Sequence, residues 1–379
     1  MKYYIIAGEA SGDLHGSNLI KGLRQLDPAS DIRAWGGDKM HAAGATLVKH
    51  YRDLAFMGFV EVVTHLRTIF KNLAFCKQDI MNFKPDVLVL VDYPGFNLRI
   101  AAWAKQMGIK VVYYISPQVW AWKESRVPAM KKNIDKMLVI LPFEKTYFKE
   151  KFDWEVDYVG HPLVGAIAAF EQNKDSHPLP TELTSLLGNK KIIAVLPGSR
   201  KQEVQKKLPI MLSMAKHFPD YQFVVAKAPS LEDQFYAPFL APYPNVEAVA
   251  GKTYALLARA EAAMVTSGTA TLETAIFGVP EVVCYKGSQI SYQIAKRLIK
   301  VKYISLVNLI MDRPVVEELI QDALTEAQLK KSLNAVLQDS EVRSRILRDY
   351  EALRTLLSAG GNASLNAAKA IVDFLGSGQ

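Results

Sequence analysis

One aspartate stands where a catalytic base is expected in a parallel α/β protein. Asp92 directly follows the apolar run Val87–Val91 and precedes the turn residues Pro94 and Gly95. Ligands of open parallel sheets bind beyond the carboxyl ends of the strands, and burial there raises the pKa of a carboxyl group toward values useful for proton transfer. Asp92 is therefore a candidate general base for a substrate hydroxyl. The spacing leaves open the alternative that Asp92 or Asn97 caps the following helix.

A loop in the second half of the chain has the composition of a phosphate site. Gly198, Ser199 and Arg200 follow the apolar run Lys191–Leu196. Small residues expose their backbone N–H groups, and a guanidinium matches the geometry of phosphate oxygens. The alternative is a surface turn in which Arg200 pairs with Glu203.

A second loop predicts a nucleotide site. Ser267, Gly268 and Thr269 lie between an apolar run and a helical segment, so a helix N-terminus with free N–H groups would face the ligand. Glu273 follows Thr269 by four residues, shares its helix face, and can accept hydrogen bonds from both ribose hydroxyls. An N-capped helix whose first-turn glutamate complements the dipole would be the structural alternative.

The first loop of the chain is small and polar. Gly8, Ser11, Gly12 and Asp13 follow the apolar run Tyr3–Ala7, and two glycines allow close approach of a ligand. The G-x-G-x-x-G spacing of a dinucleotide site is missing. Either this loop contributes to the acceptor side of the site, or Ser11 or Asp13 only caps the next helix.

Composition and missing motifs exclude several classes of protein. There is no D-x-D pair, P-loop, G-x-S-x-G elbow or H-x-x-x-H pair, so we expect neither a metal nor another cofactor. Two distant cysteines form no disulfide framework. A net charge of +8 suits an anionic ligand or membrane surface, and no nucleic-acid motif is present. No apolar run is long enough to span a membrane, so a soluble or peripheral protein is expected.

Apolar runs alternate with amphipathic segments, which is typical of a doubly wound α/β sheet. We predict two such domains, residues 1–165 and 166–379, because the pattern breaks at a polar, proline-bearing stretch. The tail from Leu324 on is predicted to be helical. The predicted strands are Tyr3–Ala7, Val87–Val91, Lys110–Ile115, Met137–Leu141, Lys191–Leu196, Gln222–Ala226, Ala262–Val265 and Glu281–Tyr285. The predicted helices are Leu14–Leu26, Phe59–Phe83, Asn97–Met107, Glu203–His217, Thr269–Phe277 and Gln289–Ile299.

Six segments, in order along about residues 1–320, resemble the lipid-A-disaccharide synthase family. Trp120, Trp122 and Leu306–Leu309 are specific to that family, whereas Ser267–Glu273 is shared with other GT-B glycosyltransferases and related epimerases. The six segments are Gly8–Asp13, Ser116–Trp122, Leu141–Lys145, Leu196–Arg200, Ser267–Glu273 and Ser305–Leu309.

The resemblance implies a GT-B fold, in which two Rossmann-like domains face each other across a cleft. It implies an inverting transfer of 2,3-diacylglucosamine from its UDP donor to 2,3-diacylglucosamine 1-phosphate, giving the β-1′,6-linked lipid A disaccharide 1-phosphate and UDP. Asp92 matches the family's general base. Arg200, Glu273, Asn308 and Gln321 match donor-side residues. Family members often carry an acidic residue where this chain has Gly95, which leaves Asp92 as the base candidate.

Two other functions stay open. One is a different GT-B enzyme, either a UDP-N-acetylglucosamine 2-epimerase or the glycosyltransferase of peptidoglycan synthesis; the Trp120/Trp122 run argues against both. The other is a non-catalytic nucleotide-sugar or lipid binder, against which the presence of Asp92 and Arg200 speaks.

A lipid substrate gives the segment 56–83 a second interpretation. Its pattern alone predicts a core helix, but with an acylated substrate an exposed part becomes a membrane-docking and acyl-binding surface. Lys296, Arg297, Lys300 and Lys302 would add attraction to anionic lipid. The resemblance then implies peripheral association with the cytoplasmic face of the inner membrane. It also implies that the C-terminal helix packs back on the first domain, and it allows a homodimer with an exchanged tail. The residues expected to contact membrane or acyl chains are Phe59, Val63, Leu66, Arg67 and Phe70.

Overall fold

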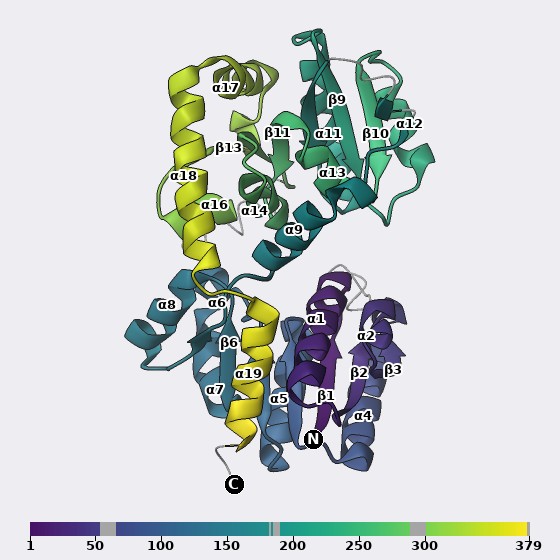
Figure 1. Cartoon of the computed structure of the whole chain (residues 1–379), viewed down its shortest axis with the longest axis vertical. Coiled ribbons are helices and arrows are strands. Elements are labelled where there is room, and N and C mark those ends of the chain that lie inside the picture. The colour runs from purple at the N-terminus through teal and green to yellow at the C-terminus, as the bar shows by residue number, and fades with distance from the viewer. Residues whose placement is uncertain (54–65, 182, 185–189, 289–300, 377–379) are drawn as a thin grey trace. The chain divides into compact units, whose positions relative to one another are not determined.

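The computed structural model describes residues 1–53, 66–181, 183–184, 190–288 and 301–376. It divides into two compact units, Met1–Pro162 with Leu357–Gln379 and Leu163–Leu356 (Figure 1). The sequence prediction divided the chain after residue 165 and allowed the C-terminal helix to pack back on the first domain. In the structure the division falls at residue 162, and the last helix packs on the first unit.

The first unit is built on a seven-stranded parallel sheet. Its central strands are continuous apolar runs and are completely buried from Tyr3 to Ala7 and from Val87 to Val91, as expected when helices cover both faces. In spatial order the strands are β3 (Thr46–His50), β2 (Asp31–Gly36), β1 (Lys2–Ala7), β4 (Val87–Val91), β5 (Val111–Tyr114), β6 (Lys136–Val139) and β7 (Asp157–Tyr158).

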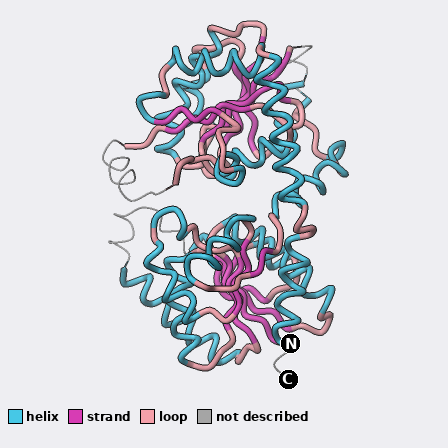
Figure 2. The backbone as a smooth tube through the Cα atoms, turned by 90° about the vertical axis from the view of Figure 1, so that its left-hand side faces the viewer, coloured by secondary structure: helices cyan, strands magenta, loops and turns pink. Residues whose placement is uncertain are grey.

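Helices lie on both sides of this sheet, as Figure 2 shows. The last helix packs closely along the first, because a Cβ on Gly22 would lie only 3.0 Å from the Cβ of Ala368. The helices of the first unit are α1 (Ala10–Leu26), α2 (Asp38–Ala42), α4 (Leu66–Phe83), α5 (Pro94–Gln106), α6 (Val119–Trp122), α7 (Val127–Asn133), α8 (Pro142–Phe152) and α19 (Ala363–Gly376).

The second unit repeats this plan on a six-stranded parallel sheet. In spatial order its strands are β10 (Val246–Ala250), β9 (Tyr221–Lys227), β8 (Lys191–Leu196), β11 (Ala260–Thr266), β12 (Glu281–Tyr285) and β13 (Glu317–Ile320). The helices are α9 (Pro162–Gln172), α11 (Lys201–Leu212), α12 (Asp233–Leu240), α13 (Thr253–Leu257), α14 (Thr269–Ile276), α16 (Leu306–Met311), α17 (Glu326–Gln338) and α18 (Ser340–Ser358). The predicted helical tail is confirmed.

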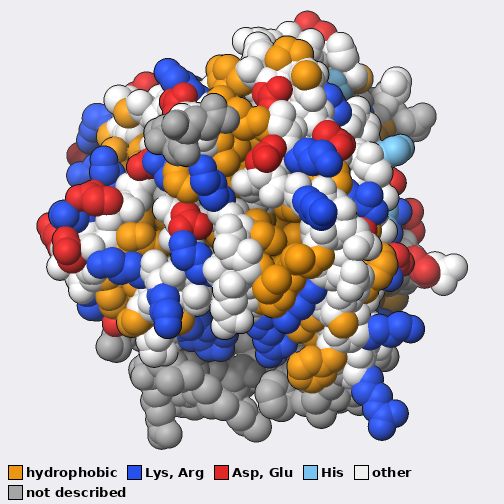
Figure 3. Space-filling view, turned by 90° about the horizontal axis from the view of Figure 1, so that it is seen from below, with side chains coloured by type: hydrophobic (Ala, Val, Ile, Leu, Met, Phe, Trp, Pro, Cys, Tyr) orange, Lys and Arg blue, Asp and Glu red, His pale blue; other side chains and the backbone are white. Residues whose placement is uncertain are grey.

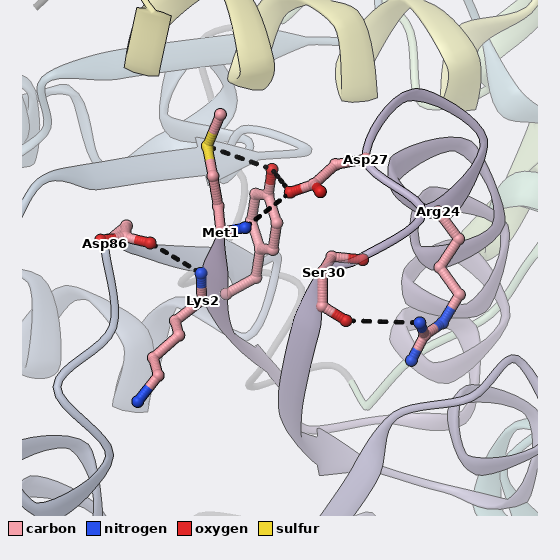
Figure 4. A network of polar contacts seen from close by, with 7 residues as sticks. Met1, Lys2, Arg24, Asp27, Ser30 and Asp86 are labelled. Carbon is pink, nitrogen blue, oxygen red and sulfur yellow. Dashed lines mark hydrogen bonds and ion pairs between the residues drawn. The ribbon is translucent and has the colours of Figure 1, made fainter. Parts of the chain in front are cut away.

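Polar contacts fix the amino end of β1, the opposite end of the strand from the loop that follows Ala7 (Figure 4). The amine of Met1 and the hydroxyl of Tyr3 both donate to the carboxylate of Asp27, at 2.9 and 3.2 Å. The amide of Lys2 donates to Asp86 at 2.7 Å. The strand that leads to the first candidate loop is thereby held at its start.

The surface mixes charge types. On the face drawn in Figure 3, lysine and arginine side chains are spread between hydrophobic and acidic ones. Among the described residues, no helix combines the length and the apolar character needed to cross a membrane. In the same part of the chain, no group of three or more His, Cys, Asp or Glu side chains is arranged to hold a metal ion.

Candidate active site

The candidate loops lie where the strand order of each sheet reverses. The reversal falls between β1 and β4 in the first sheet and between β8 and β11 in the second. Ala7 pairs with Val91, so the loops that follow them leave adjacent strands at the same level. Val265 pairs with Leu196 in the same way. Such switch points are where open α/β sheets bind ligands, so each unit brings two of the predicted loops together at its binding edge.

The backbone at Asp92 is held in an unusual conformation. Asp92 and Tyr93 both have positive φ angles, 46° and 50°, a region that non-glycine residues rarely occupy. The carbonyl oxygen of Asp92 accepts hydrogen bonds from Asn97 Nδ2 at 2.7 Å and from the Tyr113 hydroxyl at 2.5 Å. The helix-capping alternative is wrong, because Tyr93 is the N-cap of α5 and no side chain caps it. Residue 92 therefore lies in the turn before the helix and not at its N-cap.

The Asp92 carboxyl group is tuned for proton transfer. Burial, together with the negative charge of Glu9, raises its pKa from 3.8 to about 6, and a hydrogen bond from the backbone of Tyr93 partly opposes this. A base with a pKa near the working pH is ionised when needed and still accepts a proton well.

The first loop contacts the Asp92 turn directly. A Cβ added to Gly8 would lie 2.2 Å from Cδ1 of Tyr93, so the tyrosine ring occupies the space that any side chain at position 8 would need. Gly12 is buried against Ala7, since a Cβ added at position 12 would lie 3.1 Å from the Ala7 Cβ. Ser11 is exposed at this edge and is available to a ligand.

Asp13 has a structural role. Its buried carboxylate accepts hydrogen bonds from the amides of Gly37, Lys39 and Met40, at 2.8, 3.2 and 3.0 Å. It therefore caps the start of α2. The predicted capping of the following helix is wrong, because the N-cap of α1 is Glu9 and no side chain caps it. Both carboxylate oxygens are occupied, which removes Asp13 from the acceptor loop as a direct ligand.

The loop after β8 carries an exposed arginine. Gly198 adopts a φ of 113°, and a Cβ there would lie 2.7 Å from the Glu203 carboxylate. Arg200 Nη1 pairs with Glu203 at 3.3 Å, yet its side chain stays 70% exposed. An exposed pair of this kind contributes little free energy, so a phosphate can replace Glu203 as the partner of Arg200. Ser199 is exposed beside it.

The loop after β11 forms the start of α14. Gly268 is the N-cap, with a φ of 151°, and both Gly268 and Thr269 are exposed. Ser267 is turned the other way, since its hydroxyl donates to the carbonyl of Ile304 at 2.7 Å. The open N–H groups therefore belong to the residues after Ser267.

Glu273 is half-buried on the inner face of this helix. The Tyr254 hydroxyl donates to its Oε1 at 3.1 Å, and burial raises the pKa of Glu273. Glu273 therefore keeps hydrogen-bonding capacity, chiefly at its other carboxylate oxygen.

Asn308 and Gln321 differ in the hydrogen-bonding groups that they leave free for a nucleotide-sugar ligand. Asn308 is 1% exposed; its amide nitrogen donates to Val316 and Glu318, and its oxygen accepts from the Val316 amide. Its side chain is therefore fully used inside the protein, contrary to a direct donor contact. Gln321 accepts from the Gly287 amide at 2.7 Å, while its buried Nε2 has no hydrogen-bond partner among the described residues.

Sequence reasoning missed Glu318. Its carboxylate accepts from the amides of Ile304 and Ser305, from the Ser305 hydroxyl and from Asn308. It thereby holds the segment that Ser267 also contacts. The family-like run Ser305–Leu309 was the only signal, and no pattern in the sequence pairs it with a glutamate ten residues on.

Two family-like motifs meet in the first unit. The buried Trp120 indole donates to Glu144 Oε1 at 3.1 Å, and the Leu141 amide donates to Glu144 Oε2 at 3.0 Å. Burial raises the pKa of Glu144 to about 7. Trp122, in contrast, is 50% exposed.

The predicted membrane-contacting residues are described only in part. Phe59 and Val63 lie outside the described residues, as do Lys296, Arg297 and Lys300, and the side chain of Leu66 is not described. Arg67 is exposed and Phe70 is 60% exposed on α4. The opposite face of α4 packs into the core through Leu73, Cys76 and Ile80.

The sequence is similar over nearly its whole length to curated proteins of one family. A family model described as lipid-A-disaccharide synthetase matches residues 3–372. A lipid-A-disaccharide synthase of Geobacter metallireducens is 38% identical over 378 residues, covering 98% of this chain and 97% of that protein. Lipid-A-disaccharide synthase 1 of Legionella pneumophila is 38% identical, covering 94% and 93%. The synthase of Coxiella burnetii is 36% identical, covering 98% of each.

Solved structures with the same fold have much lower sequence identity. A UDP-GlcNAc 2-epimerase from Neisseria meningitidis, bound to UDP-GlcNAc, aligns with a TM-score of 0.67 at 13% identity and covers 99% of both chains. The glycotransferase of kitacinnamycin aligns with a TM-score of 0.69 at 16% identity and covers 98% of both. These likenesses and the two parallel-sheet units confirm the predicted GT-B class. The family model and the curated relatives go further than the fold: this chain belongs to the lipid-A-disaccharide synthase family, whose members are glycosyltransferases of lipid A biosynthesis.

Proposed function

We propose that Asp92 is the general base of a transfer from UDP-2,3-diacylglucosamine to the 6-hydroxyl of 2,3-diacylglucosamine 1-phosphate. The observation that carries this assignment is a half-buried carboxyl group at the switch point of the first sheet, with its pKa raised to about 6. Family membership supports the reaction class. The Gly8–Gly12 loop, which adjoins the Asp92 turn, is proposed to border the acceptor.

The proposed step is a single displacement. The acceptor 6-oxygen forms a bond to the anomeric carbon from the face opposite UDP, while the bond from that carbon to the UDP oxygen breaks. The bonding electron pair leaves with UDP, and the hydroxyl proton passes to the Asp92 carboxylate. Inversion follows from attack on the opposite face. Charge that develops on the departing diphosphate needs fixed cationic groups or N–H donors, which stabilise such a transition state.

The second unit is proposed to supply those groups. Arg200 and Ser199, together with the exposed start of α14 at Gly268 and Thr269, would contact the diphosphate. This assignment is supported by the position of both loops at the switch point of the second sheet. Glu273 would accept a ribose hydroxyl through the oxygen that Tyr254 leaves unused.

Two predicted donor-site residues take revised parts in the proposal, and a third keeps its part. Ser267 and Asn308 would position the neighbouring segment, since their side chains bond to Ile304 and to Val316 and Glu318. Gln321 keeps a buried Nε2 without a partner among the described residues, so it stays a candidate hydrogen-bond donor to the ligand.

The proposal extends to a peripheral position on the cytoplasmic face of the inner membrane. An exposed aromatic side chain at Phe70 beside the cation of Arg67 supports this, because such pairs favour the interface of an anionic bilayer. The homodimer that the family resemblance allows is a further part of the proposal, and light scattering in detergent tests it.

A coupled UDP-release assay tests the whole proposal. It uses UDP-2,3-diacylglucosamine with and without 2,3-diacylglucosamine 1-phosphate in detergent, and the lipid product is identified by mass. Acceptor-dependent UDP release with formation of a tetra-acylated disaccharide phosphate is expected. Saturable UDP binding without release would leave the donor site in place and reject the proposed reaction. The outcome of Asp92→Asn in the same assay decides the assignment of the base.

A further inference from the structure

A cavity lies between α5 and α7 in the first unit and is not used by the mechanism proposed above. Its volume is about 380 Å³, within the range of small-molecule sites. It begins at Pro94 and Gly95, two and three residues after Asp92. Its walls are mostly apolar, formed by Leu98, Ala101, Ala102, Ala129, Met130 and Ile134.

Two arginines line the same cavity. Arg99 comes from α5, and Arg126 immediately precedes α7. Neither guanidinium forms a salt bridge with any carboxylate in the described ranges. Arg126 also lies 6.0 Å from the ring centroid of the exposed Trp122, and Lys123 lies 4.0 Å from it. An apolar cavity lined by two arginines, neither in a salt bridge among the described residues, is complementary to an amphiphile that carries an anionic group.

The cavity adjoins the base. Gly95 lies in the first turn of the helix that the Asp92 turn starts, and no atom lies within 4 Å of where its Cβ would be. Tyr113 connects the two places. Its hydroxyl donates to the Asp92 carbonyl, and its pKa, raised by burial first, responds to the charges of both Asp92 and Arg126. The cavity therefore begins next to the turn that holds Asp92, and one of its arginines acts on the tyrosine that bonds to this turn.

We propose that this cavity is the acceptor subsite, with the 1-phosphate held between Arg99 and Arg126 and one acyl chain along the apolar wall. This inference rests on the proposed function. Of the two proposed substrates, only the acceptor carries a phosphate monoester, whose oxygens match two guanidinium groups. In the acceptor, C1 and C5 both adjoin the ring oxygen, so the 1-phosphate and the reacting 6-hydroxyl leave the ring from positions next to that oxygen. The acceptor therefore needs a cationic pocket close to the base, and the cavity begins at Pro94 and Gly95, which follow Asp92 by two and three residues in the chain.

A cycle of substrate and protein changes tests the phosphate contact. Wild type and the Arg99→Gln/Arg126→Gln variant are assayed with the acceptor and with 2,3-diacylglucosamine that lacks the 1-phosphate. In wild type, removing the phosphate should lower kcat/KM by roughly 10- to 100-fold. In the variant, removing the phosphate should lower kcat/KM by less than about threefold, because the arginine partners of the phosphate are already gone. Lys132→Gln removes an exposed charge from α7 outside the cavity and should behave as wild type.

A second variant tests the apolar wall. Gly95→Leu places a side chain in open space at the cavity mouth and should raise the acceptor KM at least about tenfold, with the donor KM unchanged. The assignment of the subsite would be overturned if removing the phosphate lowered kcat/KM equally in wild type and in the arginine variant. An unchanged acceptor KM in Gly95→Leu would overturn it as well. If the arginine variant instead lost binding to phosphatidylglycerol vesicles and kept its acceptor KM, the cavity would serve the bilayer and the inference would fail. Absence of any wild-type turnover would reject the proposed function itself, which is a different result.

Discussion

Replacing Asp92 with asparagine separates the proposed chemistry of this residue from its place in the fold. The hydrogen bonds that hold residue 92 use its backbone: Asn97 and Tyr113 donate to its carbonyl, and its amide donates to Tyr114. Asparagine tolerates a φ of 46° better than most residues do. The turn should therefore persist in the variant, and only the carboxylate is lost.

The expected loss of activity is large and its pH dependence is specific. Removing a general base lowers kcat by about 10²- to 10⁴-fold, which is about 2.7–5.4 kcal/mol on the barrier. In wild type, kcat/KM should fall tenfold per pH unit below about pH 6, the pKa of Asp92. The residual rate of Asp92→Asn should lack this limb. The donor KM should change little, since the donor is assigned to the other unit.

The same substitution should stabilise the fold at neutral pH. The folded-state pKa of Asp92 is raised from 3.8 to about 6, so the folded protein holds the proton more tightly than the unfolded chain. Stability therefore falls as pH rises from about 4 to 6 and then stays low. A pKa raised from 3.8 to about 6 corresponds to a loss of roughly 3 kcal/mol of folding stability at neutral pH, as an upper estimate. Asp92→Asn avoids this cost above pH 6 and gains nothing below pH 4.

Thermal unfolding at pH 4 and pH 8, beside the UDP-release assay, measures both effects. The variant should melt above wild type at pH 8 and close to it at pH 4. A kcat within about threefold of wild type would remove Asp92 from the role of base, since even the weakest general-base effects exceed that factor. If the variant and wild type differed in melting temperature by the same amount at both pH values, the proposed effect of burial on the Asp92 pKa would be refuted. The kinetic measurements would still decide whether Asp92 is the base.

Four further substitutions test other parts of the structure. Glu9→Gln removes the second cause of the raised Asp92 pKa, so the acidic limb of kcat/KM should move to lower pH; an unmoved limb would contradict that electrostatic contact. Arg200→Ala should weaken UDP binding by about 10- to 100-fold, the value of a charged hydrogen bond, in titration calorimetry, and unchanged affinity and turnover would reject the phosphate assignment. Asp13→Ala leaves three amides of the α2 start without their acceptor and should cost about 2–4 kcal/mol in urea unfolding, whereas a loss of acceptor affinity at full stability would restore its ligand role. Phe70→Asp should reduce sedimentation with anionic vesicles without lowering the melting temperature, while Met107→Asp, at a different exposed apolar residue, serves as its matched control.

The interior of the fold could be predicted from the sequence because its strands are buried on both faces. Runs such as Val87–Val91 are apolar at every position, so each was located correctly. Strands at the sheet edges were missed, and so was the interior strand β2, whose apolar run is interrupted by Asp31 and Arg33. Thr46–His50 is half-exposed throughout, and Glu317–Ile320 begins with two glutamates. Only pairing with a neighbouring strand makes such segments extended, and that neighbour lies far away in the sequence.

The candidate site shows the same limit. Residue types and strand ends located Asp92 and the loops around it, since those depend on local spacing. They could not show that Asp13 bonds to amides 24 to 27 residues away, or that Asn308 is used by Val316 and Glu318. A sequence does not distinguish a polar side chain that is free to bind a ligand from one whose hydrogen bonds are already made inside the protein. The distinction is made by tertiary contacts alone.

The packing of α19 on the first unit has a consequence for synthesis on the ribosome. The apolar cluster on one face of the first sheet includes Ala367, Ala368, Ile371 and Leu375, yet the rest of that unit ends at Pro162. At translation rates of about 5–20 residues per second, roughly 10–40 s pass between the emergence of these two parts. During that interval the nascent first unit lacks its closing helix and leaves an apolar stripe of α1 uncovered. Chaperone binding to the nascent chain, rather than rapid domain-by-domain folding, is the expected course for this half of the protein.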